Sequence, residues 1–175
     1  MDPTRADFDA RLRGLQRMTA KPIRRSLHLA SIDALYQELD RIEAADREGT
    51  LKTTGSWTPG QILMHLAAWI DYGFEGYPIR RPPFFIRWIL RWMLHGILRD
   101  GMKPGVRIPG VKEGTYGQED AETAPALAKY RQSLRRLASG EACPYDSPAF
   151  GPMSAEDRIR LNLRHAELHL GFLEY

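Results

Sequence analysis

The chain has 175 residues, the length of one ordinary domain, and 43% of them are hydrophobic, which is enough to fill a core. This composition excludes wholesale disorder. The 25 lysine and arginine residues exceed the 22 aspartate and glutamate residues, and the resulting formal charge of +3 is far below that of a dedicated nucleic-acid binder. We therefore predict no nucleic-acid partner.

The cysteine content and the first residues limit the kind of metal site and the compartment. Cys143 is the only cysteine, so no intrachain disulfide or zinc knuckle can form, and histidine or carboxylate side chains must hold any metal. Residues 1–26 are polar and rich in arginine, and we predict a loosely packed leader there, with one domain over residues 27–175. The leader lacks the apolar stretch of a secretory signal, which favours a cytoplasmic protein.

The first two predicted helices have clear start signals. One runs over about residues 31–46, with Ser31 as its N-cap and apolar residues at spacings of three and four. The next begins at Thr58, which is followed by Pro59 at the first helical position and by Gln61, whose side chain can close a capping box. Glycines at 73 and 76 are predicted to end this second helix.

Two more core-facing helices are predicted in the second half of the chain. One covers about residues 121–139, and the other begins at the N-cap Ser154, has Asp157 in its first turn and runs to the C-terminus. Alternating β patterns are nearly absent. The sequence therefore predicts an all-α fold, a four-helix bundle with one additional amphipathic helix.

The additional helix is predicted over residues 84–99. One side carries a basic stripe of four residues: Arg87, Arg91, His95 and Arg99. Three interpretations of the stripe are open: a solvated face, a funnel for an anionic substrate, or a membrane-surface contact through the Trp and Phe side. We predict that the aromatic residues belong to the core: Phe84, Phe85, Trp88 and Trp92. The segment is shorter than the roughly 20 apolar residues of a spanning helix, so we predict no stable membrane insertion.

Residues 100–120 contain five glycines and two prolines without periodicity. A long loop of this kind in a compact domain is typical of a lid, a binding loop or a disordered segment. It carries no nucleotide-binding glycine pattern.

Three histidines are candidates for a metal site. His165 and His169 are four residues apart, so on a helix they stand on one face with Cβ atoms roughly 6 Å apart. His65 lies within the second predicted helix, which a bundle can bring against the last one. Three imidazoles with an open position suit Zn²⁺ or Ni²⁺. The alternative is a solvated or packed histidine pair without metal.

Two segments carry a resemblance to a known superfamily. They are TTGSWTPGQILMHLAAWIDYGFEG (53–76) and FGPMSAEDRIRLNLRHAELHLGFL (150–173), and they resemble the DinB/YfiT-like superfamily, more narrowly one of its uncharacterised bacterial domain families. The resemblance implies a four-helix bundle with a divalent metal on His65, His165 and His169. Relatives include thiol-dependent S-transferases and maleylpyruvate isomerases, so it also implies a low-molecular-weight thiol as a cosubstrate.

Five further side chains are predicted to contact a substrate: Gln61, Trp69, Tyr72, Arg158 and Asn162. At about 100° per residue, the first three come within about 40° of His65, and the last two lie about 20° and about 60° from His165. For Trp69 and Tyr72, packing in the core is the alternative. Glu167 points about 160° from either histidine of its helix, so we assign it no catalytic role, and the catalytic group stays unknown.

These observations lead to two hypotheses of different classes. The first is a metal-dependent enzyme that activates water, as a hydrolase, or a small thiol, as an S-transferase or isomerase. Its substrate would be a small molecule, and the arginines at 158, 87 and 91 would suit an anionic one. The alternative is a non-catalytic bundle that binds a ligand or forms a homodimer, with a role in a stress response.

Overall fold

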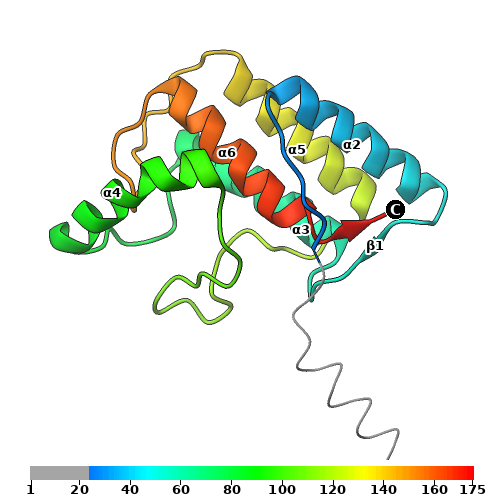
Figure 1. The fold of residues 1–175 in the computed structure, drawn as a ribbon, viewed down its shortest axis with the longest axis horizontal. Coiled ribbons are helices and arrows are strands. Elements are labelled where there is room, and N and C mark those ends of the chain that lie inside the picture. The colour runs from blue at the N-terminus through cyan, green and yellow to red at the C-terminus, as the bar shows by residue number, and fades with distance from the viewer. Residues whose placement is uncertain (1–23) are drawn as a thin grey trace, which may run out of the picture.

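The computed structural model describes residues 24–175 (Figure 1). The predicted leader, 1–26, therefore falls mostly outside the described residues, and the domain boundary stays a prediction. The described part is all-α apart from one short sheet, as predicted. Its helices are α2 (Ile32–Arg47), α3 (Pro59–Glu75), α4 (Phe84–Asp100), α5 (Thr123–Ala138) and α6 (Ala155–Leu170).

The predicted helix starts are confirmed by their hydrogen bonds. The hydroxyls of Ser31 and Ser154 each accept a bond from the backbone N–H three residues on. Thr58 accepts from the N–H of Gln61 at 3.2 Å, and the Gln61 side chain accepts from the N–H of Thr58 at 2.9 Å. Each such cap stabilises its helix by about 0.5–2 kcal/mol, so the local sequence positions both helices that carry the histidines.

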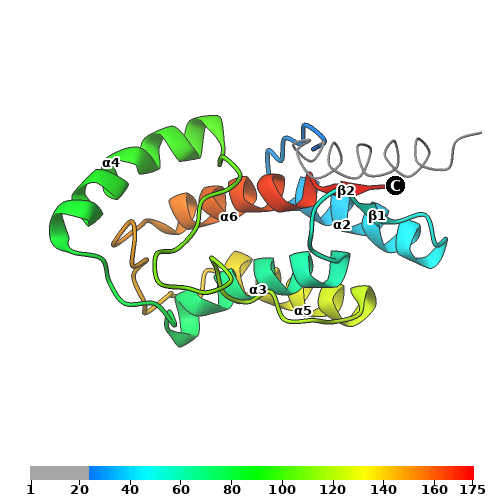
Figure 2. The same cartoon turned by 90° about the horizontal axis from the view of Figure 1, so that it is seen from below.

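Four helices form the core in two layers. Seen from below, α2 and α6 make one layer and α3 and α5 the other (Figure 2). Their inward side chains form one cluster of buried leucine, isoleucine, alanine and aromatic residues. The α3 helix begins so close to the segment before α5 that a Cβ on Gly60 would lie 1.9 Å from the carbonyl oxygen of Ala121. Only glycine permits this contact.

The prediction that the aromatic residues of α4 belong to the core is wrong. Phe84 is 83% exposed, Trp88 75% and Trp92 77%, so these side chains do not belong to the core. The helix lies outside the four-helix layers and packs on α6 (Figures 1 and 2). Leu94 on its opposite side is the buried residue. An amphipathic pattern cannot say which side of a helix is buried when both sides carry apolar residues, as here.

Polar bonds hold α4 at its middle and near its C-terminal end. An Arg91 N–H donates to the carbonyl oxygens of Phe150 and Pro152 in the segment before α6. Near the C-terminal end of α4, Arg164 of α6 donates to the carbonyl oxygen of Leu98 at 3.1 Å. The helix is therefore held in one orientation, with its aromatic side outward.

The end of the chain also differs from the prediction. Helix α6 stops at Leu170, and the next residues form β2 (Leu173–Glu174), which pairs antiparallel with β1 (Lys52–Thr53). A strand of two residues has no alternating pattern, so the sequence carried no signal for it. The loop after α4 runs back along α3 to the start of α5 (Figure 2).

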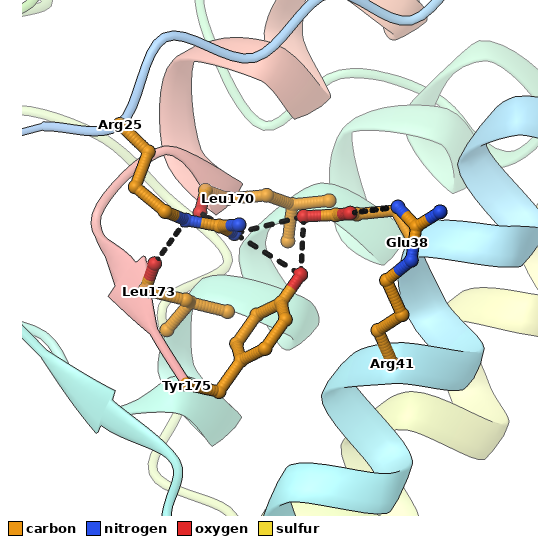
Figure 3. Close-up of polar contacts among 6 residues, drawn as sticks. All are labelled: Arg25, Glu38, Arg41, Leu170, Leu173 and Tyr175. Carbon is orange, nitrogen blue, oxygen red and sulfur yellow. Dashed lines mark hydrogen bonds and ion pairs between the residues drawn. The ribbon is translucent and has the colours of Figure 1, made fainter.

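A buried carboxylate joins three distant segments next to this sheet (Figure 3). Glu38 is 1% exposed and accepts hydrogen bonds from Arg25 at 2.8 Å, from Tyr175 at 2.6 Å and from Arg41 at 3.2 Å. Arg25 also donates to the carbonyl oxygen of Leu173 at 2.6 Å. These bonds attach the segment before α2 and the end of the chain to the bundle.

Among residues 24–175, no helix has both the length and the apolar character needed to cross a membrane.

Candidate metal centre

The structure brings the three predicted histidines together. His65 comes from α3, and His165 and His169 come from successive turns of α6 in the other layer. One ring nitrogen of each lies within 4.8 Å of those of the other two. The ring centroids are 4.6–4.9 Å apart in all three pairs. The arrangement depends on the packing of α3 against α6, which the capped helix starts and the core leucines set.

The backbone of the long loop orients His65. Its Nδ1 lies 2.8 Å from the carbonyl oxygen of Tyr116. A carbonyl oxygen can only accept, so Nδ1 carries the proton of the neutral ring and Nε2 keeps a free lone pair. That Nε2 faces the Nε2 of His165 at 3.1 Å. The tautomer of His65 is therefore the one that a metal ligand needs, with a backbone carbonyl on its other nitrogen.

The separation of one nitrogen pair matches that of two ligands on a shared ion, and all three nitrogens lie within 4.8 Å of one another. Two ligands that hold zinc at about 2.0–2.1 Å in tetrahedral geometry lie roughly 3.3 Å apart. The Nε2 atoms of His65 and His165 are 3.1 Å apart. The donor set consists of imidazoles alone, which suits Zn²⁺, Ni²⁺ or a similar borderline ion. The residues present therefore fit a divalent transition metal.

The same surroundings keep the three rings neutral. Burial lowers the pKa of His65 to about 4, although the bond to Tyr116 acts in the opposite direction. Burial, with a contribution from His65, lowers the pKa of His169 to about 3. Burial and the two neighbouring histidines also hold the pKa of His165 well below its usual range. All three rings are consequently neutral at neutral pH, so each keeps one nitrogen lone pair, as metal binding requires.

Two tryptophans enclose the histidines. Trp57, just before α3, stacks on His169 with a centroid distance of 5.3 Å and an interplanar angle of 4°, and its ring meets the edge of His65 at 5.0 Å. The ring centroid of Trp69 lies 5.9 Å from the ring centroids of both His65 and His165. The Nε1 of Trp69 is buried and has no hydrogen-bond partner within the described residues. The site therefore has apolar walls and one unused donor.

Sequence reasoning missed Trp57 and Tyr116. Trp57 precedes the N-cap Thr58, a position from which its ring can reach the second turn of α3, so its place beside the cap was a usable signal. Tyr116 acts through its backbone carbonyl, which every residue has. No residue type could have indicated it.

The predicted polar substrate contacts make hydrogen bonds within the protein. Gln61 closes the capping box of α3. The amide nitrogen of Asn162 donates to the carbonyl oxygen of Arg158 one turn earlier, at 2.9 Å. Arg158 is buried, donates to the carbonyl oxygen of Tyr145 at 3.0 Å and lies 3.9 Å from Asp146. These bonds organise the helix starts and the segment before α6.

Of the two predicted aromatic contacts, Trp69 lies beside the histidines and Tyr72 lies one ring further away. Tyr72 follows Trp69 on α3, with ring centroids 5.9 Å apart, and Tyr77 contacts both of them. Burial, with smaller contributions from Glu119 and other acidic groups, raises the pKa of Tyr72, so its hydroxyl is protonated at neutral pH. Trp69, Tyr72 and Tyr77 form a row of rings that we call the aromatic wall, and its Trp69 end lies beside His65 and His165.

Glu167 faces away from the histidines. Its carboxylate accepts a hydrogen bond from the N–H of Leu29 at 2.6 Å and pairs with Arg164. It therefore anchors the segment before α2 to α6.

Comparison with known proteins identifies the family of the chain. No curated protein and no solved structure matches the chain significantly. The family model described as "Protein of unknown function (DUF1569)" matches residues 21–175, which include every helix that the structure describes and the three histidines. Because this match covers well over half of the sequence, the chain belongs to the DUF1569 family.

Proposed function

We propose that this chain is a metal-dependent enzyme with the four-helix bundle of the DinB/YfiT-like superfamily. One divalent ion, zinc or nickel, is held by His65, His165 and His169. The observation that carries the proposal is the convergence of these three ring nitrogens within 4.8 Å. The Tyr116 carbonyl supports the proposal, because its bond to the Nδ1 of His65 leaves the lone pair on Nε2 for a metal.

An ion on three neutral imidazoles keeps its full positive charge, and when bound it supplies Lewis acidity to a water, as in a hydrolase, or to a small thiol, as in an S-transferase or isomerase. The protein residues prepare the site for this chemistry. The Tyr116 carbonyl fixes the ring of His65, and Trp57 and Trp69 limit the access of bulk water to the histidines. A water-poor site strengthens electrostatic interactions within it.

We assign the substrate contacts to the aromatic wall. Trp69 offers an unused Nε1 donor, and Tyr72 offers a protonated hydroxyl beside it. The polar groups of Gln61 and Asn162 are bonded within their own helices, which speaks against their role in substrate binding. The wall suits a small substrate with an apolar or planar part and one hydrogen-bond acceptor.

The first test is metal content. Protein purified without a histidine tag should contain about one zinc or nickel ion per chain by elemental analysis. The double variant His65→Ala His169→Ala should contain almost none. The matched control is His95→Ala, because His95 is an exposed histidine on α4 and its loss should leave the metal content unchanged. Wild-type protein that lacks metal and takes up neither Zn²⁺ nor Ni²⁺ would refute the proposal.

A second measurement separates the enzyme from a non-catalytic bundle. In an enzyme of this type the ion keeps an exchangeable coordination position, whereas a structural ion is closed off by the protein. The visible spectrum of the cobalt-substituted protein should therefore change when a small thiol is added. A spectrum that thiols and other small ligands leave unchanged, at full metal content, would favour the non-catalytic alternative.

A further inference from the structure

Helix α4 presents an unusual apolar face to solvent. The residues on it that remain exposed are Phe84, Phe85, Ile86, Trp88, Ile89, Trp92 and Met93. Exposed fractions of 83% for Phe84, 75% for Trp88 and 77% for Trp92 mean that these rings contact little of their own chain. Single exposed apolar residues are common, but a continuous face of this size marks an interaction surface.

The chain segment that carries this face is basic, although Arg99 is paired with Asp100 at the end of α4, and Asp157 of α6 lines a pocket with His95 and Arg99. Between Glu75 and Asp100 there is no acidic residue, while the same stretch holds five arginines: Arg80, Arg81, Arg87, Arg91 and Arg99. If a second copy covered the face with its own α4, these like charges would be brought together, which opposes association. An anionic partner is complementary to the surface.

A groove lies at the start of the face. It has a volume of about 490 Å³ and lies between the first turns of α4 and the segment Phe150–Pro152. Phe84, Phe85 and Trp88 line it together with Arg87, whose Nε is buried without a hydrogen-bond partner in the described part of the chain. The groove thus joins apolar walls to an arginine with unused hydrogen-bonding capacity.

We propose that α4 binds the surface of an anionic lipid membrane. The Trp and Phe side chains enter the region between headgroups and acyl chains, and the arginines at 80, 81 and 87 pair with lipid phosphates. The bonds of Arg91 and Arg164 hold the helix with its aromatic side outward, so little ordering is needed on binding. The helix lies in the membrane plane, since it is too short and too basic to span. This proposal is independent of the histidine site.

The test is co-sedimentation of the full chain with vesicles. Binding should be measured on phosphatidylcholine vesicles with and without about 30% phosphatidylglycerol, which provides the negative surface. We expect binding to the anionic vesicles at least about tenfold stronger, and weaker again when salt is raised from about 0.05 M to about 0.5 M. The tryptophan emission should shift to shorter wavelength on binding.

Two pairs of variants test the contributions separately. Trp88→Ser Trp92→Ser should weaken binding to anionic vesicles about tenfold or more, while Val106→Ser, which changes an exposed apolar residue on the loop, should not. Arg80→Gln Arg81→Gln should weaken binding similarly, while Arg47→Gln Arg135→Gln, at two exposed arginines of other helices, should have a smaller effect. The substituted residues are exposed, so the unfolding temperatures should stay close to that of the wild type.

Two results would overturn the proposal. One is equal and weak sedimentation with both kinds of vesicle. The other is concentration-dependent self-association without lipid, seen by analytical ultracentrifugation and abolished by Trp88→Ser Trp92→Ser, together with no vesicle binding. The second result would assign the face to a homodimer.

Discussion

The carboxylate of Glu38 is the most completely buried acidic group of the bundle, and its surroundings explain why it stays charged. Burial by itself raises the pKa of a carboxyl group, but the hydrogen bonds from Tyr175 and Arg25 outweigh burial and lower the pKa of Glu38 below its usual range. Arg25 is itself bonded to the carbonyl oxygen of Leu173. Glu38 therefore links the chain end to α2.

Replacing this residue should reveal the contribution of the cluster. Glu38→Gln keeps the size of the side chain but removes the charge that Arg25 and Arg41 face, so we expect a loss of about 1–3 kcal/mol in the free energy of unfolding at pH 7. The depressed pKa of Glu38 contributes stability above the unfolded pKa of about 4.3, and this stability is lost as the pH falls through the folded pKa. The variant should therefore show a smaller loss of stability between about pH 5 and pH 3.

Urea unfolding at several pH values measures both effects. Glu48→Gln is the control, since Glu48 is an exposed carboxylate at the end of the same helix. If the two variants behave alike at pH 7, the cluster of Figure 3 makes no special contribution to stability.

At the level of single residues, part of the candidate site could be predicted. The spacing of His165 and His169 on a helix, with His65 on a second helix, follows from helical geometry and from the resemblance of the two motif segments. Whether the histidines hold metal stays a prediction. The carbonyl of Tyr116 could not be foreseen, because a backbone group has no signature in the sequence.

At the level of elements, the sequence was a better guide to where the helices lie along the chain than to which side of each helix is buried. Ser31, Thr58 and Ser154 cap three of them through local bonds that depend on only a few neighbouring residues. The outward face of α4 depends instead on contacts with α6 and with residues 150–152, which are distant in the sequence. Local patterns carry no information on such contacts.

The loop between α4 and α5 offers a test at the same scale. Gly117 has φ of +83°, and a Cβ there would lie 2.5 Å from the Cβ of Ala68 on α3. Gly117→Ala should push the loop away from α3 and weaken the bond from His65 to Tyr116. Loss of a partner that orients a metal ligand typically lowers affinity about 10–100-fold, so we expect a zinc dissociation constant higher by about that factor.

The control for this prediction is Gly105→Ala. Gly105 has a similar φ of +86° on the same loop, but a Cβ there has nothing within 4 Å. It therefore suffers the same backbone strain without contact with α3. Competition titration with a chromophoric chelator measures the zinc affinity of both variants. An equal change in the two would show that backbone strain in the loop, rather than contact of the loop with α3, affects zinc binding.

At the level of the whole molecule, the histidines connect the two layers of the bundle. His65 belongs to the layer of α3 and α5, and His165 and His169 belong to the layer of α2 and α6 (Figure 2). A ligand that binds only the folded protein stabilises it by mass action, by about 4 kcal/mol at a thousandfold excess over the dissociation constant. Metal bound at this site would hold the layers together.

Without metal, the same histidines should make the fold sensitive to acid. The pKa values of about 4 for His65 and about 3 for His169 lie below the usual value of 6.5, so the unfolded chain binds more protons than the folded one across this range. Stability is therefore complete above about pH 6.5 and falls as the pH decreases toward 4. One fully titrating histidine contributes a slope of about 1.4 kcal/mol per pH unit.

This slope can be measured by urea unfolding in the presence of a chelator at about pH 7, 6 and 5. His65→Gln His169→Gln removes two of the titrating groups, so the free energy of unfolding should fall less steeply with acid than in the wild type, whatever its value at pH 7. His95→Gln removes an exposed histidine and should leave the slope unchanged. Equal slopes in all three proteins would mean that the buried rings are protonated as readily in the folded state as in the unfolded one. A pocket of that kind would not keep the three histidines ready to bind a metal at neutral pH.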